Sequence, residues 1–157
     1  MEFEDRQRAL DFATKWHNGQ KRKDGKDYIT HPIAVAEIAM KLYLDTNPII
    51  DSYAAEFLNE IYVVSLLHDV VEDTEATIRD ISDIFGYRVA LAITLLSRSK
   101  DQTYFEFIMN LVTQHDFLPV YVKLADLTHN MSDLNEGSLK DKYRFAYYIL
   151  SHYITTD

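Results

Sequence analysis

The sequence predicts an all-α protein that folds as a single domain over residues 1–157. Apolar residues recur at the three- and four-residue spacing of amphipathic helices along most of the chain. Glycine and proline are scarce, with four and three residues, and no segment alternates polar and apolar residues as a half-buried strand does. A chain of 157 residues is long enough to bury one core of its own.

Turn and cap residues divide the first half of the chain into three helices. The first is expected from about residue 4 to 16, because apolar side chains share one face and Asn18–Gly19 is a common helix stop. Pro32 suits the first turn of a second helix that reaches about residue 44. After a break at Asn47–Pro48, a long apolar helix is expected from about residue 54 to 71.

The second half of the chain is divided by the same kinds of residue. Thr77 is a good N-cap and Gly86 a good helix stop, and together they bound a short helix. The helices expected after it cover residues 87–97, 103–115 and 118–131, with a last one from about Ser138. The last helix is rich in tyrosine, which suits either core packing or the surface of an oligomer.

Charge and composition exclude several classes of protein. The net charge of −9 argues against nucleic acid as the main partner, because phosphate binding usually shows as a basic domain. No apolar run is long enough to cross a bilayer, and the acidic start of the chain is unlike a signal peptide. A cytoplasmic protein without membrane contact is therefore expected. The absence of cysteine excludes disulfides and thiolate metal sites.

The segment SLLHDVVEDT, residues 65–74, places four groups able to bind a metal or move a proton inside an apolar run. On a continuous helix, with about 100° between residues, these groups share one side. They are His68, Asp69, Glu72 and Asp73. Three carboxylates at the C-terminal end of a helix oppose its macrodipole and destabilise it unless a cation compensates. The motif therefore indicates either a metal site or a solvated helix end.

Further candidate ligands occur elsewhere in the chain. His31 precedes Pro32 in YITHP, on a loop able to reach inward, and Asp126 interrupts the apolar run VKLADLTHNM. Asn130 lies one turn after Asp126 on the same helix face, and His129 is a less favoured participant. Two histidines and two aspartates make a mixed nitrogen and oxygen site, suited to Mn²⁺, Fe²⁺, Zn²⁺ or Mg²⁺.

A basic loop, KRKDGK at residues 21–26, interrupts the otherwise acidic chain. Its cations are Lys21, Arg22, Lys23 and Lys26. Such a cluster suits a small anionic ligand, although a solvated loop has the same composition. Charge alone favours the solvated loop.

The order His31, then the pair His68–Asp69, then Asp126 resembles the metal ligands of HD-domain phosphohydrolases. A narrower resemblance is to the hydrolase domain of Rel/SpoT-type enzymes and to the small alarmone hydrolases. Three segments carry it: HNGQKRKDGKDYITHP, LLHDVVEDT and VKLADLTHNM. The resemblance implies a single compact bundle of helices around one Mn²⁺. It also implies hydrolysis of the 3′-diphosphate of guanosine tetra- or pentaphosphate (ppGpp or pppGpp), with release of pyrophosphate and without synthetase activity.

The resemblance also implies a role for each matching residue. The implied metal ligands are His31, His68, Asp69 and Asp126. The residues implied to position and deprotonate the attacking water are Glu72 and Asp73, and the implied nucleotide contacts are Arg22, Lys23 and Asn130. An anionic nucleotide favours the functional interpretation of the basic loop, because arginine and lysine offset phosphate charge.

One departure from the pattern keeps the substrate open. Asp133 stands where the pattern has threonine, so an acid occupies a position expected to contact the nucleotide, and Asp27 replaces a proline. Asp133 motivates a second interpretation, a phosphohydrolase of another nucleotide such as an adenosine alarmone or an NADPH-like molecule. A third interpretation is a non-catalytic module that binds a nucleotide or a partner protein, against which the intact Glu72 and Asp73 argue.

Overall fold

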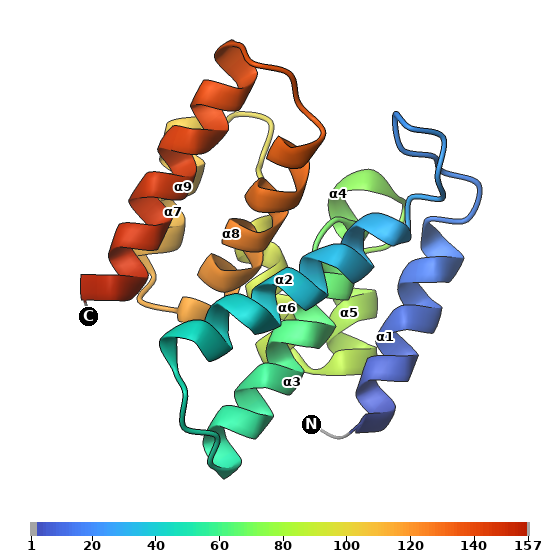
Figure 1. Ribbon diagram of the computed structural model, residues 1–157. Coiled ribbons are helices and arrows are strands. Elements are labelled where there is room, and N and C mark those ends of the chain that lie inside the picture. Colours follow the sequence, from blue (N-terminus) through green and yellow to red (C-terminus); the bar gives the residue numbers. More distant parts are fainter. Residues whose placement is uncertain (1–2, 157) are drawn as a thin grey trace.

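Helix α8 (Phe117–Ser132) runs between two groups of helices (Figure 1). The computed structural model describes residues 3–156. On one side of α8 lie α1 (Phe3–Trp16), α2 (Thr30–Thr46), α3 (Ser52–Leu67), α4 (Val70–Asp73), α5 (Ile78–Phe85) and α6 (Tyr87–Leu96), and on the other α7 (Tyr104–Thr113) and α9 (Ser138–Thr156). The described residues contain helices and no strand, so the all-α prediction is confirmed.

Two clusters of buried apolar residues lie on opposite sides of α8. One contains Val122 and Ala125 together with residues of α1 to α6. The other contains Leu124 and Leu127 together with residues of α7 and α9. Because α8 is covered from two sides, even its polar residue Asp126 is only 5% exposed.

Side-chain caps fix several helix starts where the sequence predicts them. Thr77 accepts a hydrogen bond from the backbone N–H of Asp80 and forms a capping box with it at the start of α5. Thr103 and Glu106 form the same arrangement at the start of α7. α5 ends at Phe85, and Gly86 follows it with a φ of 86°, in the left-handed region that glycine adopts without strain.

α2 begins two residues earlier than predicted, at Thr30 rather than Pro32. The backbone N–H of Thr30 donates to the carbonyl of Asp27, and that of His31 donates to the carbonyl of Tyr28. These bonds extend the helical turn upstream of the proline. His31 therefore belongs to a helix and not to a loop, and it is 1% exposed.

The long helix predicted over residues 54–71 is wrong at its end. α3 stops at Leu67, and the single turn α4 begins only at Val70. The chain turns at Asp69, where φ is −98° and ψ is −8°. The three acids of the motif thus do not crowd the C-terminus of one long helix, and the macrodipole argument for a cation does not apply.

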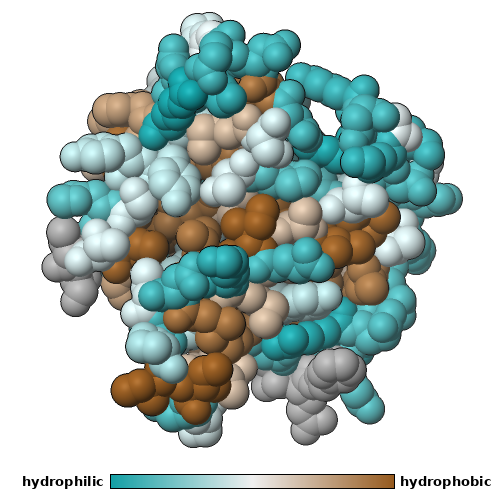
Figure 2. Space-filling view, in the orientation of Figure 1, coloured by the Kyte–Doolittle hydropathy of each residue, from teal (hydrophilic) through white to brown (hydrophobic). Residues whose placement is uncertain are grey.

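Apolar side chains gather on one part of the face shown in Figure 2, over the connection between α2 and α3. Ile49 and Ile50 of that connection are exposed. Hydrophilic side chains cover much of the upper part of the same face. Among the helices of the described residues, none is both long enough and apolar enough to span a membrane.

Candidate metal centre

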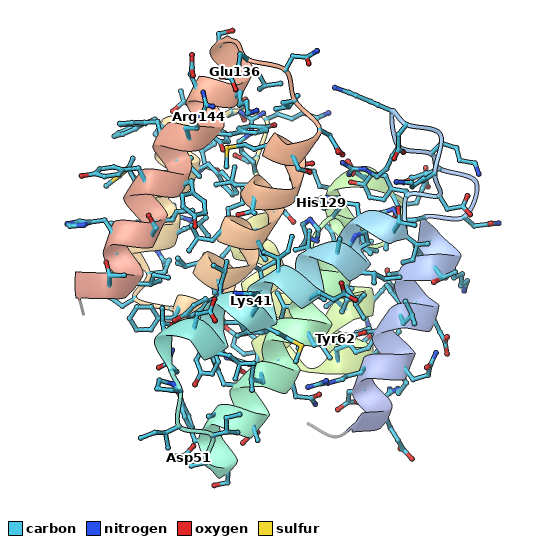
Figure 3. The ribbon with its side chains drawn as sticks, in the orientation of Figure 1. Lys41, Asp51, Tyr62, His129, Glu136 and Arg144 are labelled. Carbon is cyan, nitrogen blue, oxygen red and sulfur yellow. The ribbon has the colours of Figure 1, made fainter. Side chains whose placement is uncertain are left out.

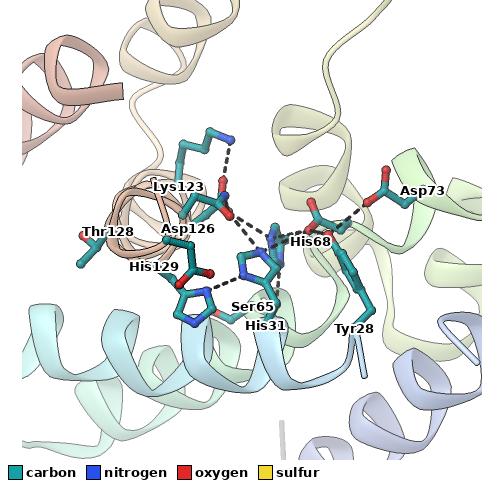
Figure 4. A network of polar contacts seen from close by, with 12 residues as sticks. Tyr28, His31, Ser65, His68, Asp73, Lys123, Asp126, Thr128 and His129 are labelled. Carbon is teal, nitrogen blue, oxygen red and sulfur yellow. Dashed lines mark hydrogen bonds and ion pairs between the residues drawn. The ribbon is translucent and has the colours of Figure 1, made fainter. Parts of the chain in front are cut away.

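Three separate parts of the fold bring side chains to one point (Figure 4). His31 comes from the first turn of α2, and Asp126 comes from the second half of α8. His68 and Asp69 come from the bend between α3 and α4. Because α2 packs against both α3 and α8, the four residues predicted to bind a metal become neighbours in space.

The ligand atoms of His31, His68 and Asp69 all lie within 4.8 Å of one another. Oδ1 of Asp126 is 3.2 Å from Nε2 of His31 and 3.7 Å from Nε2 of His68. Two imidazole nitrogens and two carboxylate oxygens therefore surround one small volume. This donor set is suited to a divalent transition metal.

A hydrogen bond to a backbone carbonyl orients the ring of His68. Its Nδ1–H donates to the carbonyl oxygen of Ser65 at 2.7 Å, since a carbonyl can only accept. Nε2 lies 3.0 Å from Oδ2 of Asp69, is buried, and makes no hydrogen bond within the described part of the protein. Metal-binding histidines usually donate their other ring N–H to a carbonyl or carboxylate, so these residues fit a bound cation.

The surroundings of His68 favour a positive charge. Burial opposes its protonation, but the carboxylates of Asp69 and Asp126 outweigh burial and raise the pKa of His68 to about 10. Burial also opposes ionisation of Asp69, yet His68 and His31 hold the pKa of Asp69 well below its usual range. A proton and a metal cation are therefore alternatives for the same negative site.

Asp126 is fixed by two neighbours on α8. Nζ of Lys123 lies 2.7 Å from Oδ2 of Asp126, and the side-chain amide of Asn130 donates to Oδ1 at 2.6 Å. Asn130, predicted as a nucleotide contact, thus also touches a candidate ligand. Sequence reasoning missed Lys123, although a cation three residues before an acid inside an apolar run is a usable signal.

His129 contacts His31, one of the two histidines among the candidate ligands. Its Nδ1 lies 2.7 Å from Nδ1 of His31, and its side chain extends from α8 toward the start of α2 (Figure 3). One of these two nitrogens donates the hydrogen bond and the other accepts it. The second ring nitrogen of His31, Nε2, faces Asp126. The sequence favoured His129 only weakly, because the contact depends on how α2 packs against α8.

Tyr28 joins the metal site to the acidic pair, Glu72 and Asp73. Its hydroxyl oxygen lies 2.6 Å from Oδ2 of Asp69 and 3.1 Å from Oδ2 of Asp73. Burial and these two carboxylates raise the pKa of Tyr28, so the hydroxyl keeps its proton and donates a hydrogen bond to one of them. No spacing in the sequence predicts this contact, because Tyr28 and Asp69 are 41 residues apart.

The acidic pair borders the same cavity as the candidate ligands, here called the metal-site cavity, with a volume of about 250 Å³. Oε2 of Glu72 accepts a hydrogen bond from the backbone N–H of Arg98 at 3.3 Å. Burial and the nearby Asp69 charge raise the pKa of Glu72 and of Asp73. The bend between α3 and α4 therefore still directs all four groups of the motif to one place.

Cations and aromatic rings form the rest of the metal-site cavity. Arg98 lies between α6 and α7, Lys123 on α8, and Lys142 on α9. Nζ of Lys142 is 4.4 Å from the centroid of the Tyr104 ring, a cation–π contact. None of these residues follows from a motif, because α9 and the α6–α7 connection reach the cavity only in the folded chain.

A second cavity, here called the side cavity, has a volume of about 270 Å³. It shares Tyr28, Asn130 and Tyr143 with the metal-site cavity, so the two are adjacent. Arg22 and Lys23 also line the side cavity. The three residues predicted to contact the nucleotide therefore line one cavity beside the metal site.

A larger cavity, of about 710 Å³, lies between the C-terminal end of α2 and the N-terminal end of α8. It is lined mainly by aromatic residues, among them Tyr43 and Tyr121. None of the four candidate ligands, all of which the structure describes, borders it. Cavity size alone therefore does not locate the functional site.

Known proteins resemble this chain over most of its length. A family profile described as HD domain matches residues 9–153. The bifunctional (p)ppGpp synthase/hydrolase SpoT of Escherichia coli strain K12 is 37% identical over 140 residues, which are 82% of this chain and 18% of that protein. A guanosine-3′,5′-bis(diphosphate) 3′-pyrophosphohydrolase of Haemophilus influenzae is 38% identical over 138 residues, again 82% of this chain and 18% of the relative. The chain thus spans only a small part of these curated relatives.

A solved structure has the same fold. It is described as a metazoan ortholog of SpoT that hydrolyses ppGpp, and it matches 98% of this chain and 85% of its own chain. The TM-score is 0.65 and the sequence identity is 22%, which establishes the fold alone. Together with the profile match over residues 9–153, the resemblance inferred from the sequence motifs is confirmed. The chain belongs to the HD domain family.

Proposed function

We propose that the chain is a metal-dependent pyrophosphohydrolase that removes the 3′-diphosphate of ppGpp or pppGpp as pyrophosphate. One observation carries this proposal: two histidines and two aspartates converge on one point of a cavity that also holds two further acids and three cations. The relative in Haemophilus influenzae is named for this reaction, and the name of the Escherichia coli relative includes hydrolysis of (p)ppGpp.

The converging residues are the proposed ligands of a single Mn²⁺. They are His31, His68, Asp69 and Asp126. A divalent cation bound there lowers the pKa of a water molecule and polarises a phosphoryl oxygen. Lys123 and Asn130 support this assignment, because ligands held by their own hydrogen-bond partners keep a fixed orientation.

Glu72 and Asp73 are the proposed proton acceptors. Their raised pKa values make both carboxylates better bases than free ones. The backbone N–H of Arg98 orients Glu72, and the Tyr28 hydroxyl lies beside Asp73. The proton of the attacking water passes to one of these two carboxylates.

The cations of the metal-site cavity offset the charge of the substrate. A 3′-diphosphate is strongly anionic, and the carboxylates of the site repel it. Arg98 and Lys142 border the same cavity as these carboxylates and attract the phosphates. Lys23 in the side cavity adds a further positive charge.

Two further proposals concern where the protein acts and how its chain is organised into domains. Because ppGpp is a soluble anionic nucleotide, we propose that the protein acts in the cytoplasm. We also propose that residues 1–157 act as one domain, since the family profile extends from residue 9 to residue 153.

The test is to strip the protein of metal, resupply Mn²⁺, and follow pyrophosphate and phosphate separately with a panel of nucleotides. Pyrophosphate released from ppGpp, and abolished by EDTA, is the expected result. Release from a different nucleotide alone supports the second interpretation, a phosphohydrolase of another nucleotide. Binding without any release contradicts both enzymatic interpretations and leaves the non-catalytic module.

A further inference from the structure

We propose that Asp133, held in place by Arg22, recognises the base of the nucleotide by accepting hydrogen bonds from its N–H groups, and so selects guanine. This inference rests on the proposed function, because it assigns a base-binding role in the cavity beside the proposed metal site. It names a residue that determines specificity, at a position that lines the side cavity and where the sequence pattern departs toward an acid.

Arg22 and Asp133 form an ion pair across the side cavity. Nη2 of Arg22 lies 2.6 Å from Oδ2 of Asp133, although the residues are 111 positions apart. The Arg22 side chain is 13% exposed and the Asp133 side chain is 50% exposed. The guanidinium is thus the covered partner, and the carboxylate remains accessible to a ligand.

The backbone fixes both members of this pair. Asp133 directly follows α8, and its N–H donates to the carbonyl oxygens of Asn130 and Met131. Arg22 lies in a tight loop, where its N–H donates to the carbonyl of Lys26 at 2.9 Å. The pair therefore joins the loop before α2 to the end of α8, and it holds the carboxylate at one side of the cavity.

The ion pair changes the role expected for Arg22. The Asp133 carboxylate already compensates the charge of the Arg22 guanidinium. Arg22 is therefore less available to bind phosphate than the sequence pattern implies. The cations Arg98, Lys123 and Lys142 lie instead in the metal-site cavity, where the phosphates have to be. Arg22 is therefore a positioning residue for Asp133.

The side cavity has the lining that a purine base requires. The rings of Tyr28 and Tyr143 and the side chains of Leu134 and Leu139 supply apolar surface beside the Asp133 carboxylate. Because Tyr28 and Tyr143 border both cavities, a nucleotide with its 3′-diphosphate at the metal site extends naturally into the side cavity.

The carboxylate distinguishes bases by their hydrogen-bonding edge. Guanine presents N1–H and a 2-amino N–H side by side, which match the two oxygens of a carboxylate. Inosine lacks the 2-amino group, and adenine presents a lone pair at N1 that the carboxylate repels. A carboxylate offers about four lone-pair sites, so Asp133 accepts from Arg22 and from the base together. The hydrogen bond from Arg22 also lowers the pKa of Asp133, which keeps the acceptor ionised.

The test compares hydrolysis of the 3′-diphosphates of guanosine, inosine and adenosine nucleotides by the wild-type protein and by Asp133→Asn. The wild-type kcat/KM is expected to be about 10- to 100-fold higher for the guanosine than for the inosine substrate, as for a hydrogen bond to a charged group. In Asp133→Asn this ratio is expected to fall toward one, through a higher KM for the guanosine substrate. Asp45→Asn is the matched control, because Asp45 is also exposed and paired with a cation, Lys41.

The outcomes separate this inference from the proposed function. If the wild-type protein hydrolyses guanosine and inosine substrates equally well, or if Asp133→Asn keeps the wild-type ratio, base recognition by Asp133 is wrong and the hydrolase stands. If the wild-type protein hydrolyses none of the three, the proposed function itself fails. A ratio that changes equally in Asp45→Asn also overturns the inference, because that variant leaves the side cavity intact.

Discussion

Nε2 of His68 lies 3.0 Å from Oδ2 of Asp69, although the two residues are adjacent in the chain. Neighbouring side chains on a regular helix point about 100° apart, so this approach depends on the bend at Asp69. Leu67 and Val70, on either side of the pair, remain buried in the apolar core. The bend therefore lets an apolar stretch of chain supply two adjacent polar groups to the same site.

Asp126→Ala is expected to weaken Mn²⁺ binding by about 100-fold or more, because it removes one proposed ligand. Isothermal titration of metal-free protein with Mn²⁺ measures the change in Kd. Asp126→Asn, which keeps the volume of the side chain, is the second variant in case the alanine protein does not fold. Normal stoichiometry and affinity in both variants, with normal circular dichroism spectra, contradict the assignment of Asp126 as a ligand.

The fold class and the neighbourhood of the candidate ligands could be predicted because their signals are local. Helical periodicity and caps such as Thr77 are written in consecutive residues, and the structure agrees with them. The break after Leu67 could not be predicted, since the apolar pattern continues through Val70 and Val71 without a glycine or proline. Because of this break, the acids of the motif do not crowd one helix end. The four polar groups of the motif nevertheless line one cavity, as the motif predicts.

Apart from the ligand set that the family resemblance implies, contacts between distant segments could not be predicted from the sequence. Tyr28 meets Asp69 across 41 residues, and His31 meets His129 across 98 residues. Each contact exists only because α2 packs against α3 and α8. The roles proposed for the metal ligands and for Glu72, in contrast, remain predictions.

Lys123→Met is expected to destabilise the metal-free protein by about 3 kcal/mol. This value is the lower end for a broken buried ion pair, because Asn130 still donates a hydrogen bond to Asp126. Urea unfolding in the presence of EDTA measures the change in the free energy of unfolding.

The matched control for this prediction is Lys41→Met. Lys41 and Asp45 also form an ion pair, with side chains that are 75% and 59% exposed, and a pair of this kind contributes about 1 kcal/mol or less. Equal losses of stability in the two variants would mean that burial of the Lys123 pair has no energetic consequence.

Glu72→Gln is expected to lower kcat for ppGpp by about 10²- to 10⁴-fold, the usual contribution of a general base. The amide keeps the size of the side chain and its contact with the backbone N–H of Arg98, so Mn²⁺ content is expected to be unchanged. Steady-state kinetics and metal analysis of the same preparation check both statements.

Glu75→Gln is the control for the base, because Glu75 is a nearby exposed acid outside the lining of the metal-site cavity. It is expected to retain wild-type kcat. Loss of metal from Glu72→Gln would make Glu72 a ligand instead, and an unchanged kcat would leave Asp73 as the proton acceptor.

Glu136 and Arg144 anchor the connection between α8 and α9, which contributes Leu134 to the side cavity (Figure 3). Nη1 and Nη2 of Arg144 donate to the two carboxylate oxygens at 2.7 and 2.9 Å. These bonds, with one from Lys140, lower the pKa of Glu136 from 4.5 to about 2. Because the folded-state pKa is lowered, the stabilisation is complete above about pH 4.5 and is lost as the pH falls through about 2.

NMR titration of the Glu136 carboxyl is therefore expected to give a pKa of about 2 in the wild type and a value closer to 4.5 in Arg144→Gln. A wild-type pKa near 4.5 would show that the pair does not persist in solution, and that the connection is not anchored by it.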